Sequence, residues 1–488
     1  MSKLEELKHL GLESQKVFDY FEEICAIPHG SRNTKQISDY LVEFAKTHGL
    51  KYYQDEANNV VIIQEATPGY EGADPIIIQG HMDMVCEKES GYEIDFEREG
   101  LKLYVDGDFL RAEGTTLGGD DGIAIAYVLA IMDSPEIAHP RLEAVITVDE
   151  EIGMLGAEVI DLSMLTGNKL LNIDSDIEGH FLTSCAGGMT ASTTIPVRYS
   201  TQRGLSVQVT VTGLKGGHSG SEIDKEHANA NIVMGRLLKY VCDRMELGIV
   251  SLAGGLKDNA IPRECAAHLL IPSEKKEEFL GYMEELSHIL KKEFAASDDG
   301  IRIETEFGAE LESKILDYSA MAKVIFYLRN VPNGVQHMSA VMPGLVETSL
   351  NLGILELKEE ALLAVTSVRS SVSSRKEELA DRLGHIAELL GGEISVSGDY
   401  PAWEYRADSE LRGTISAVYR ELFDEEPIFE AIHAGLECGI LSGKIDDLDC
   451  VSFGPNNYDI HTPKERLSIS STEKVWKLLK EFLKRCNG

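Results

Sequence analysis

A short run of branched apolar residues, Ile76–Ile78, is the feature that most constrains the fold. It lies between Asp74 and Gly80, and its length and composition predict a strand buried on both faces, as in the middle of a parallel sheet. His81 and Asp83 come directly after it. Side chains two residues apart on extended backbone point to the same side, so an imidazole and a carboxylate are predicted to meet at the end of this strand.

This pair suits a metal site. One ring nitrogen of His81 can bind a cation while Asp83 orients the ring or a bound water. Taken alone, a His-x-Asp pair is more often structural, because many histidines have no catalytic role. The interpretation therefore depends on the residues at the ends of the other predicted strands.

Two more buried strands are predicted, at 143–149 and 169–174. The first is followed by Glu150 and Glu151, and the second ends in Asp174. Between them and the first strand lies a glycine-rich loop, 114–122, which opens an apolar helix at 123–132. The loop contains no lysine and lacks the spacing of a phosphate-binding loop or a dinucleotide fingerprint. Strands that alternate with helices predict an α/β fold with a mostly parallel sheet, whose ligands collect at the carboxyl ends of the strands.

The candidate metal ligands lie at these strand ends and near the C-terminus: His81, Asp120, Glu151, Asp174 and His461. Two imidazoles and three carboxylates can hold two zinc ions, with one carboxylate shared between them. A water between two cations loses a proton easily, and the metals also polarise a substrate carbonyl. Glu150, next to Glu151, is the candidate general base that would pass the proton to a leaving nitrogen.

The middle of the chain has a different character. Half-exposed alternating strands and long helices predict an inserted α+β domain at 188–398 with one open sheet face, and the order of its elements suggests two similar halves. Residues 1–187 and 399–488 are then predicted to complete one sheet. A final helix is predicted at 473–486, with capping candidates at 470–472.

Composition narrows the possible functions. A chain of 488 residues predicts more than one domain. The 82 acidic and 46 basic residues give a net charge of −36, which opposes a nucleic-acid partner. No apolar run is long enough for a membrane span, and the charged start at 1–8 is unlike a signal peptide, which predicts a cytoplasmic protein. The 8 cysteines are scattered, which argues against a disulfide framework or a structural zinc cluster.

Seven motifs resemble one known group of enzymes. They begin at Gly80, Gly114, Val148, Asn172, Lys215, Asn259 and His433, and read GHMDMV, GTTLGGDDG, VDEEIGM, NIDSD, KGGHSG, NAIPRE and HAGLECG. Together they resemble the bacterial aminoacyl-histidine dipeptidases, in the dizinc peptidase family that includes carboxypeptidase G and the carnosinases. The resemblance spans nearly the whole chain in the right order.

The resemblance implies a catalytic domain interrupted by a lid domain, with zinc bound by the five candidate ligands. It makes Asp120 the bridging carboxylate, Glu150 the general base and Asp83 the acid that orients its neighbours, and it implies a non-proline cis peptide just after the bridge. Spacing alone leaves Asp121 open as the bridge, because neighbouring loop carboxylates cannot be ranked in this way.

The resemblance also implies roles for residues of the inserted domain. His218 would stabilise the tetrahedral oxyanion. The predicted substrate-binding residues are Arg369, Asn259, Gly435 and Glu437. A guanidinium is well shaped for a substrate carboxylate, and the alternative for Arg369 is a solvated arginine at a strand end. His433 is interpreted as a residue behind the metal ligands.

The sequence therefore predicts a dizinc dipeptidase that cleaves Xaa-His dipeptides and β-alanyl-histidine, with a substrate range that could be broader, and with Mn²⁺ or Co²⁺ as substitutes for zinc. An N-acyl amino acid deacylase needs the same metal centre, and a non-catalytic metal-binding protein on this fold is a third hypothesis. A small peptide is the predicted partner, without nucleic acid or membrane. The chain is expected to form a homodimer, and a monomer is also compatible with the sequence.

Overall fold

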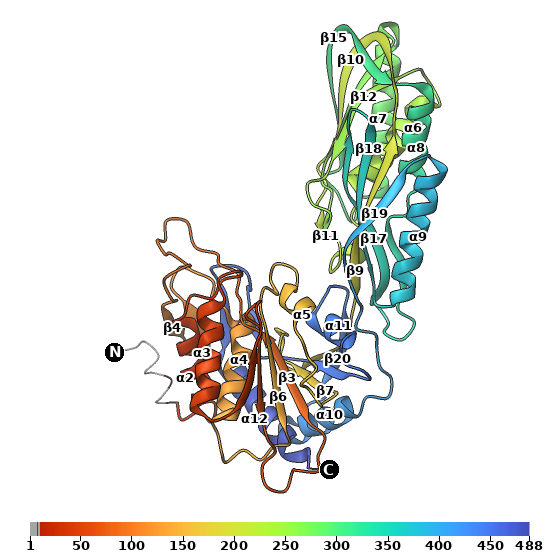
Figure 1. Ribbon diagram of the computed structural model, residues 1–488. Helices are drawn as coiled ribbons and strands as arrows, with labels where there is room; N and C mark the ends of the chain where they lie inside the picture. The colour runs from red at the N-terminus through yellow and green to blue at the C-terminus, as the bar shows by residue number, and fades with distance from the viewer. Residues whose placement is uncertain (1–6, 8–9, 488) are drawn as a thin grey trace. The chain divides into compact units, whose positions relative to one another are not determined.

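The computed structural model describes residue 7 and residues 10–487, so most of the charged stretch at 1–8 lies outside the described residues. The chain forms two compact units (Figure 1). Unit 1 consists of Met1–Ser184, Tyr405–Ala431 and Leu436–Gly488, and unit 2 consists of Cys185–Glu404 and Ile432–Gly435. Each unit has its own hydrophobic core. Among the described helices, none combines the length and the hydropathy of a bilayer-spanning segment.

Unit 1 is built on an 8-stranded sheet with the order β1-β2-β6-β3-β7-β21-β8-β20. The strands are β1 (Lys51–Gln54), β2 (Val60–Gln64), β3 (Ile76–His81), β6 (Leu142–Thr147), β7 (Lys169–Asn172), β8 (His180–Cys185), β20 (Ile428–Ile432) and β21 (Asp449–Ser452). Strand β3 runs parallel to both β6 and β7, and all its residues are buried. The predicted central parallel strand is confirmed, whereas β1, β2 and β8 pair antiparallel towards the edges.

Helices cover this sheet. They are α2 (Gln15–Cys25), α3 (Lys35–Thr47), α4 (Gly119–Met132), α5 (Leu155–Val159), α10 (Glu410–Phe423), α11 (Glu437–Ser442) and α12 (Ile469–Arg485). Helix α4 packs between β3 and α2, and its residues 122–132 are all buried, which explains why it is apolar on every side. A small second sheet has the order β22-β23-β5-β4, with β4 (Leu103–Asp106), β5 (Phe109–Ala112), β22 (Asn457–Tyr458) and β23 (Arg466–Ser468).

The C-terminal helix starts earlier than predicted. Helix α12 begins at Ile469, and Ser468 caps it, because its side chain accepts the main-chain N–H of Ser471. The capping candidates at 470–472 therefore lie inside the first turn, and that prediction was wrong. Strand β23 ends directly at this cap, so no separate loop precedes the helix.

Unit 2 contains a 9-stranded sheet with the order β15-β10-β14-β12-β17-β18-β9-β19, and β16 pairs with β17 beside it. Its strands are β9 (Gly187–Pro196), β10 (Tyr199–Thr212), β12 (Gly248–Gly254), β14 (Cys265–Ile271), β15 (Arg302–Leu316), β16 (Gly334–Met338), β17 (Val346–Leu357), β18 (Ala361–Ser370) and β19 (Glu393–Tyr400). Helices α6 (Ala230–Cys242), α7 (Lys276–Glu293), α8 (Tyr318–Asn330) and α9 (Ser373–Leu389) line one face of the sheet (Figure 1). The alternating burial along β9 and β18 agrees with one open face.

Two halves of unit 2 share one element order. The first half runs β10-α6-β12-β14-α7-β15, and the second runs β9-α8-β17-β18-α9-β19. In each half the first strand lies between the third and the fourth, and the two halves join where β12 pairs antiparallel with β17. The first strand of the second half, β9, therefore precedes the whole first half in the sequence.

Candidate metal centre and active site

The five predicted metal ligands all belong to unit 1, and the structure brings them together. His81 ends β3, while Glu151 and Asp174 follow the neighbouring strands β6 and β7. Because these strands are parallel, their carboxyl ends meet at one edge of the sheet. Asp120 lies in the non-helical entry to α4, and His461 lies in the loop between β22 and β23.

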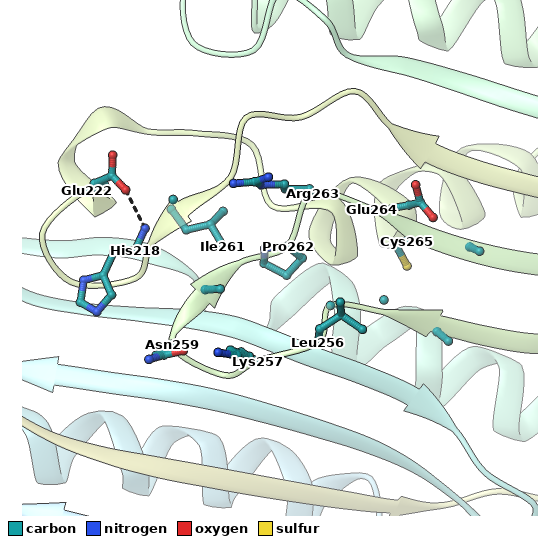
Figure 2. A pocket seen from close by; sticks show the side chains of 16 residues that line it. His218, Glu222, Leu256, Lys257, Asn259, Ile261, Pro262, Arg263, Glu264 and Cys265 are labelled. Atoms are coloured by element: carbon teal, nitrogen blue, oxygen red, sulfur yellow. Dashed lines mark hydrogen bonds between the residues drawn. The ribbon is translucent and has the colours of Figure 1, made fainter. Parts of the chain in front are cut away.

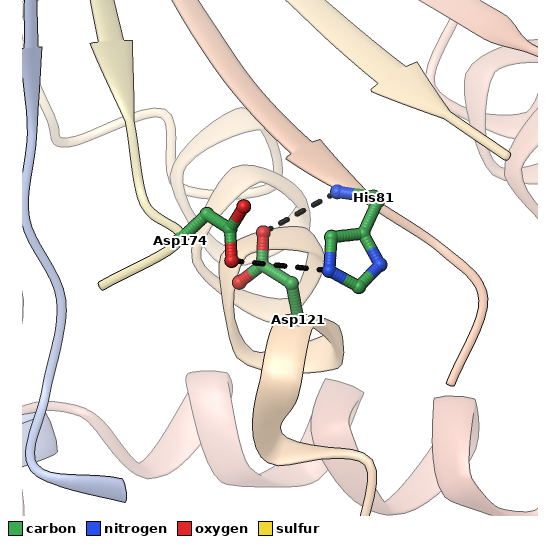
Figure 3. Close-up of side chains that lie close together, drawn as sticks. All are labelled: His81, Asp121 and Asp174. Atoms are coloured by element: carbon green, nitrogen blue, oxygen red, sulfur yellow. Dashed lines mark hydrogen bonds and ion pairs between the residues drawn. The ribbon is translucent and has the colours of Figure 1, made fainter. Parts of the chain in front are cut away.

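Asp120 joins the two histidines. Its Oδ1 lies 3.1 Å from Nε2 of His81, and its Oδ2 lies 3.2 Å from Nε2 of His461. The Nε2 of His81 is also 3.8 Å from Oδ1 of Asp174 (Figure 3). On the other side, Nε2 of His461 is 3.0 Å from Oε1 of Glu151. The cluster therefore consists of two groups, each with one histidine and one terminal carboxylate, that share the Asp120 carboxylate.

Asp121, the alternative bridge, has a different environment. It is buried, and its Oδ2 accepts the main-chain N–H of His81 at 3.3 Å (Figure 3). Gly80 makes this approach possible, because a Cβ at that position would lie 2.5 Å from Oδ2 of Asp121. Asp121 could still join His81 and Asp174 around one ion, but only Asp120 faces both histidines. The geometry thus favours Asp120 as the shared carboxylate, and the peptide bond between the two aspartates is cis.

Asp83 holds the parts of this cluster in position. Its main-chain oxygen lies 2.9 Å from Nδ1 of His81, which directs Nε2 of that ring towards the carboxylates. Its Oδ1 accepts the N–H of Glu150 at 3.0 Å, and its Oδ2 accepts the hydroxyl of Ser31 at 2.8 Å. Asp83 therefore links the end of β3 to the segment after β6.

The histidines are strongly basic in these surroundings. Burial lowers the pKa of His81, but hydrogen bonds to Asp120 and Asp83 outweigh it and raise the pKa well above 6.5. Hydrogen bonds to Asp120 and Glu151 raise the pKa of His461 to about 10. Burial opposes ionisation of Asp120, yet its bonds to the two histidines lower the pKa of that carboxyl.

The donor set fits a pair of divalent cations. Burial raises the pKa of Asp174 well above its ordinary value, and neighbouring carboxylates add to the shift. Among the described residues, the recorded ion pairs of Asp120, Glu151 and Asp174 are all with histidine, so no lysine or arginine balances their charge. Imidazole nitrogens and carboxylate oxygens are ligands that zinc accepts, and two such ions would supply positive charge beside these carboxylates.

Glu150 lies beside these ligands as a partly buried carboxyl group. Burial raises its pKa to about 8 against the opposing effect of His81, and the nearby carboxylates of Glu437 and Glu151 contribute to the rise. A carboxyl group of this kind can hold and release a proton near neutral pH.

Glu437 is at the centre of a hydrogen-bond network beneath the ligands. It is completely buried, and its Oε2 accepts Nε2 of Gln79 at 2.5 Å and the hydroxyl of Thr147 at 2.6 Å. The Oε1 of Gln79 accepts Nδ2 of Asn172 at 2.6 Å. These contacts join β6, β3 and β7 and give Glu437 a structural role. Its Oε1 is buried without a hydrogen-bond partner, and the substrate contact expected of Glu437 from sequence stays a prediction. Polar residues within apolar strands were the signal that sequence reasoning missed.

His218 lies in unit 2 and lines a pocket of about 890 Å³ (Figure 2). The pocket is also lined by Glu222, Leu256, Lys257, Asn259 and Arg263. The Nδ1 of His218 accepts the main-chain N–H groups of Gly220 and Ser221 at 3.2 and 3.1 Å. Burial and the charge of Arg369 lower the pKa of His218, which favours the neutral ring. Because Nδ1 accepts these two N–H groups, the proton of the neutral ring belongs on Nε2.

Arg369 and His433 also belong to unit 2, as does Gly435, the last residue before the chain re-enters unit 1. The Nη1 of Arg369 donates to the hydroxyl of Tyr400 at 2.9 Å, while its Nε is buried without a hydrogen-bond partner. No carboxylate of the described residues is recorded in an ion pair with this guanidinium, which agrees with a site for an anionic group of a substrate.

Comparisons with known proteins agree with this geometry. Residues 77–485 match peptidase family M20/M25/M40. The chain is 34% identical over 475 residues to the cytosol non-specific dipeptidase of Escherichia coli (strain K12), covering 97% of this chain and 98% of that protein. A crystal structure of aminoacylhistidine dipeptidase from Vibrio alginolyticus has a TM-score of 0.91 at 34% identity, with 97% of each chain covered. Aminopeptidase PepT from Bacillus cereus ATCC 10987 shares the fold, with a TM-score of 0.57 at 14% identity over 98% of this chain and 100% of PepT. The predicted resemblance is confirmed, and the chain belongs to peptidase family M20/M25/M40.

Proposed function

We propose that this protein is a dizinc dipeptidase that hydrolyses short unblocked dipeptides, including Xaa-His and β-alanyl-histidine. The observation that carries the proposal is the position of Asp120, whose two carboxylate oxygens each face a histidine accompanied by a terminal carboxylate. The relatives named as dipeptidases cover nearly the whole chain, which supports the substrate class.

Residues of unit 1 would hold the metals and move the proton. His81 and Asp174 would bind one zinc ion, His461 and Glu151 the other, and Asp120 would join them. When bound, the two ions supply positive charge that polarises the peptide carbonyl and acidifies water. Glu150 takes a proton from the attacking water and returns it to the leaving nitrogen. Asp83 holds the main chain of Glu150 and the ring of His81 in position through its hydrogen bonds.

Residues of unit 2 would bind the substrate, and we propose this unit as the lid domain that interrupts the catalytic domain. The Nε2–H of His218 would donate to the oxyanion, since its Nδ1 is engaged by main-chain N–H groups. Arg369 would bind the substrate carboxylate, with Asn259 and Gly435 as further substrate contacts. Mn²⁺ or Co²⁺ could replace zinc, because both accept the same nitrogen and oxygen ligands.

A single assay tests this function. Zinc-loaded protein is offered a dipeptide library together with N-acetyl and N-succinyl amino acids, with and without a chelator. We expect hydrolysis of dipeptides that the chelator abolishes. Hydrolysis of the acylated amino acids alone would identify a deacylase, and zinc binding without any hydrolysis would identify a non-catalytic protein.

The setting of the enzyme is also a proposal. The name of the relative from E. coli supports a cytosolic location for this chain, which fractionation of cells would check. We propose a homodimer, and sedimentation of the zinc-loaded protein would distinguish it from a monomer.

A further inference from the structure

The loop that carries His461 also carries a carboxylate, Glu465, which contacts the loop that carries Asp120. Glu465 is only 3% exposed. Its Oε2 accepts the main-chain N–H groups of Leu117 and Gly118 at 2.7 and 3.0 Å, and its Oε1 accepts that of Gly119 at 2.9 Å. The N–H of Asp120 itself lies 3.4 Å from Oε1. One side chain thus fixes the main chain of the whole segment that leads into the shared ligand.

The local sequence is adapted to this close approach. Gly118 has φ +70°, a conformation that favours glycine, and a Cβ at Gly119 would lie 2.8 Å from Nδ2 of Asn457. That amide nitrogen donates to Oε1 of Glu465 at 3.1 Å. Asp120 and Asp121 have non-helical dihedral angles at the start of α4. The N–H groups at the start of a helix have no acceptor within the helix, so those of 117–119 need another partner.

Glu465 is also tied to the second histidine. It lies four residues after His461 in a tight turn, where its N–H donates to the main-chain oxygen of Thr462 at 3.0 Å. The hydroxyl of Thr462 donates to the oxygen of Asp459 at 2.7 Å. His461 has φ +60°, which is uncommon for a residue other than glycine and indicates that its surroundings constrain it. The segment that holds His461 therefore holds the Asp120 loop as well.

We infer that Glu465 is a positioning residue of the metal centre, which sets the distance between the Asp120 carboxylate and the His461 imidazole before a metal binds. This inference rests on the proposed dizinc function. It does not make Glu465 a metal ligand, because both its oxygens are occupied by N–H donors. Residues that orient metal ligands typically contribute 10- to 100-fold to metal affinity or activity, so about this factor is expected here.

Glu465→Gln is the informative variant. It keeps the shape of the side chain, but either orientation of the amide places an NH₂ group against main-chain N–H donors. Glu143→Gln is a matched control. Glu143 is also buried and accepts the main-chain N–H groups of Thr166 and Gly167. It lies at the start of β6, away from the metal centre, and it also accepts Nε–H of Arg141 at 2.8 Å, so its loss should cost at least as much stability.

The experiment measures the Kd of Zn²⁺ by competition with a chelator, and the absorption spectrum of the Co²⁺-substituted protein, for wild type and both variants. We expect Glu465→Gln to raise at least one Zn²⁺ Kd by about 10- to 100-fold and to change the Co²⁺ spectrum. Glu143→Gln should lower the melting temperature while it leaves the Kd within about 2-fold of wild type.

The outcomes separate the two proposals. Wild-type protein that binds no Zn²⁺ would overturn the proposed function itself. Wild-type protein that binds Zn²⁺ and cleaves dipeptides, with an unchanged Kd in Glu465→Gln, would overturn only the role of Glu465. An equal loss of affinity in both variants would also overturn it, because the effect would then follow from lost stability.

If Glu465→Gln does not fold, hydrogen exchange of the wild-type protein tests the same inference. The amides of 117–119 should be protected from hydrogen exchange equally in zinc-loaded and chelator-treated protein, because Glu465 holds them without metal. Fast exchange of these amides in the chelator-treated protein would show that the metal, and not Glu465, orders the loop.

Discussion

Glu150 and Glu151 are neighbours with different surroundings. Glu151 faces His461, whereas Glu150 is held by its main-chain N–H on Asp83 and has a pKa raised to about 8 by burial. We predict that Glu150→Gln retains both metals and lowers kcat by about 10²- to 10⁴-fold, the usual contribution of a positioned general base. Steady-state kinetics combined with metal analysis checks this. Normal turnover with full metal content would remove Glu150 from the reaction.

His218 is predicted to act on the transition state. Its Nε2–H is free to donate because Nδ1 accepts two main-chain N–H groups. His218→Ala should therefore lower kcat by about 10²- to 10³-fold and change KM much less. The comparison of kcat and KM for one dipeptide provides the test. A raised KM at constant kcat would instead indicate a residue that binds the ground state.

His433 makes unit 2 sensitive to acid. It is buried, its Nε2 lies 2.7 Å from the hydroxyl of Ser349, and burial together with the charge of Arg369 lowers its pKa from 6.5 to about 3. The unfolded chain binds a proton below pH 6.5 that the folded chain does not, so stability falls as the pH drops from there towards 3. The free energy of unfolding should decrease by up to about 1.4 kcal/mol per pH unit, and His433→Asn should reduce this slope. Equal slopes for the two proteins would contradict the prediction.

At the scale of the elements, the parallel strands β3, β6 and β7 end at the metal centre. Glu437 from α11 connects them through hydrogen bonds to Gln79 and Thr147. Removing its carboxylate in Glu437→Ala takes away the short hydrogen bonds of the buried Gln79 and Thr147. Each donor then keeps only a 3.4 Å contact, from Gln79 to Thr147 and from Thr147 to the main-chain oxygen of Gly80. The expected cost is about 1–3 kcal/mol of unfolding free energy, measured by urea denaturation. Glu437→Gln keeps an acceptor oxygen and should cost less. If both variants have wild-type stability, the network does not support the sheet.

The positions of β3 and β7 could be predicted because a short run of buried apolar residues leaves little freedom in where a central strand lies. The predicted strand at 169–174 nevertheless extended two residues beyond the end of β7 at Asn172. The contact between Glu465 and Asp120 could not be predicted in this way, because 345 positions separate the two residues. Neither segment carries a periodic pattern that points to the other. The start of α12 was misplaced for a related reason, since Ser468 and the serines after it are equally good caps by composition.

At the scale of the whole molecule, the sequence indicated an insertion at 188–398, and the structure has units that divide at 184/185 and 404/405. The change from buried parallel strands to half-exposed alternating strands marks the first division. The sequence did not predict that residues 432–435 belong to unit 2. Four residues are too few to show the hydrophobic periodicity of a helix or a strand. A segment this short can be assigned to a unit only from the folded structure.

The separation of the cores predicts two unfolding transitions that respond differently to metal. All five candidate ligands lie in unit 1, and unit 2 has its own core. A ligand that binds only the folded form stabilises it by about 2.7 kcal/mol at a hundred times its Kd. Calorimetry should therefore show one transition that a chelator shifts to lower temperature and one that it leaves unchanged, and hydrogen exchange should assign the shifted one to unit 1. A single transition that shifts as a whole would mean that the two units unfold together, and no shift at all would contradict metal binding in unit 1.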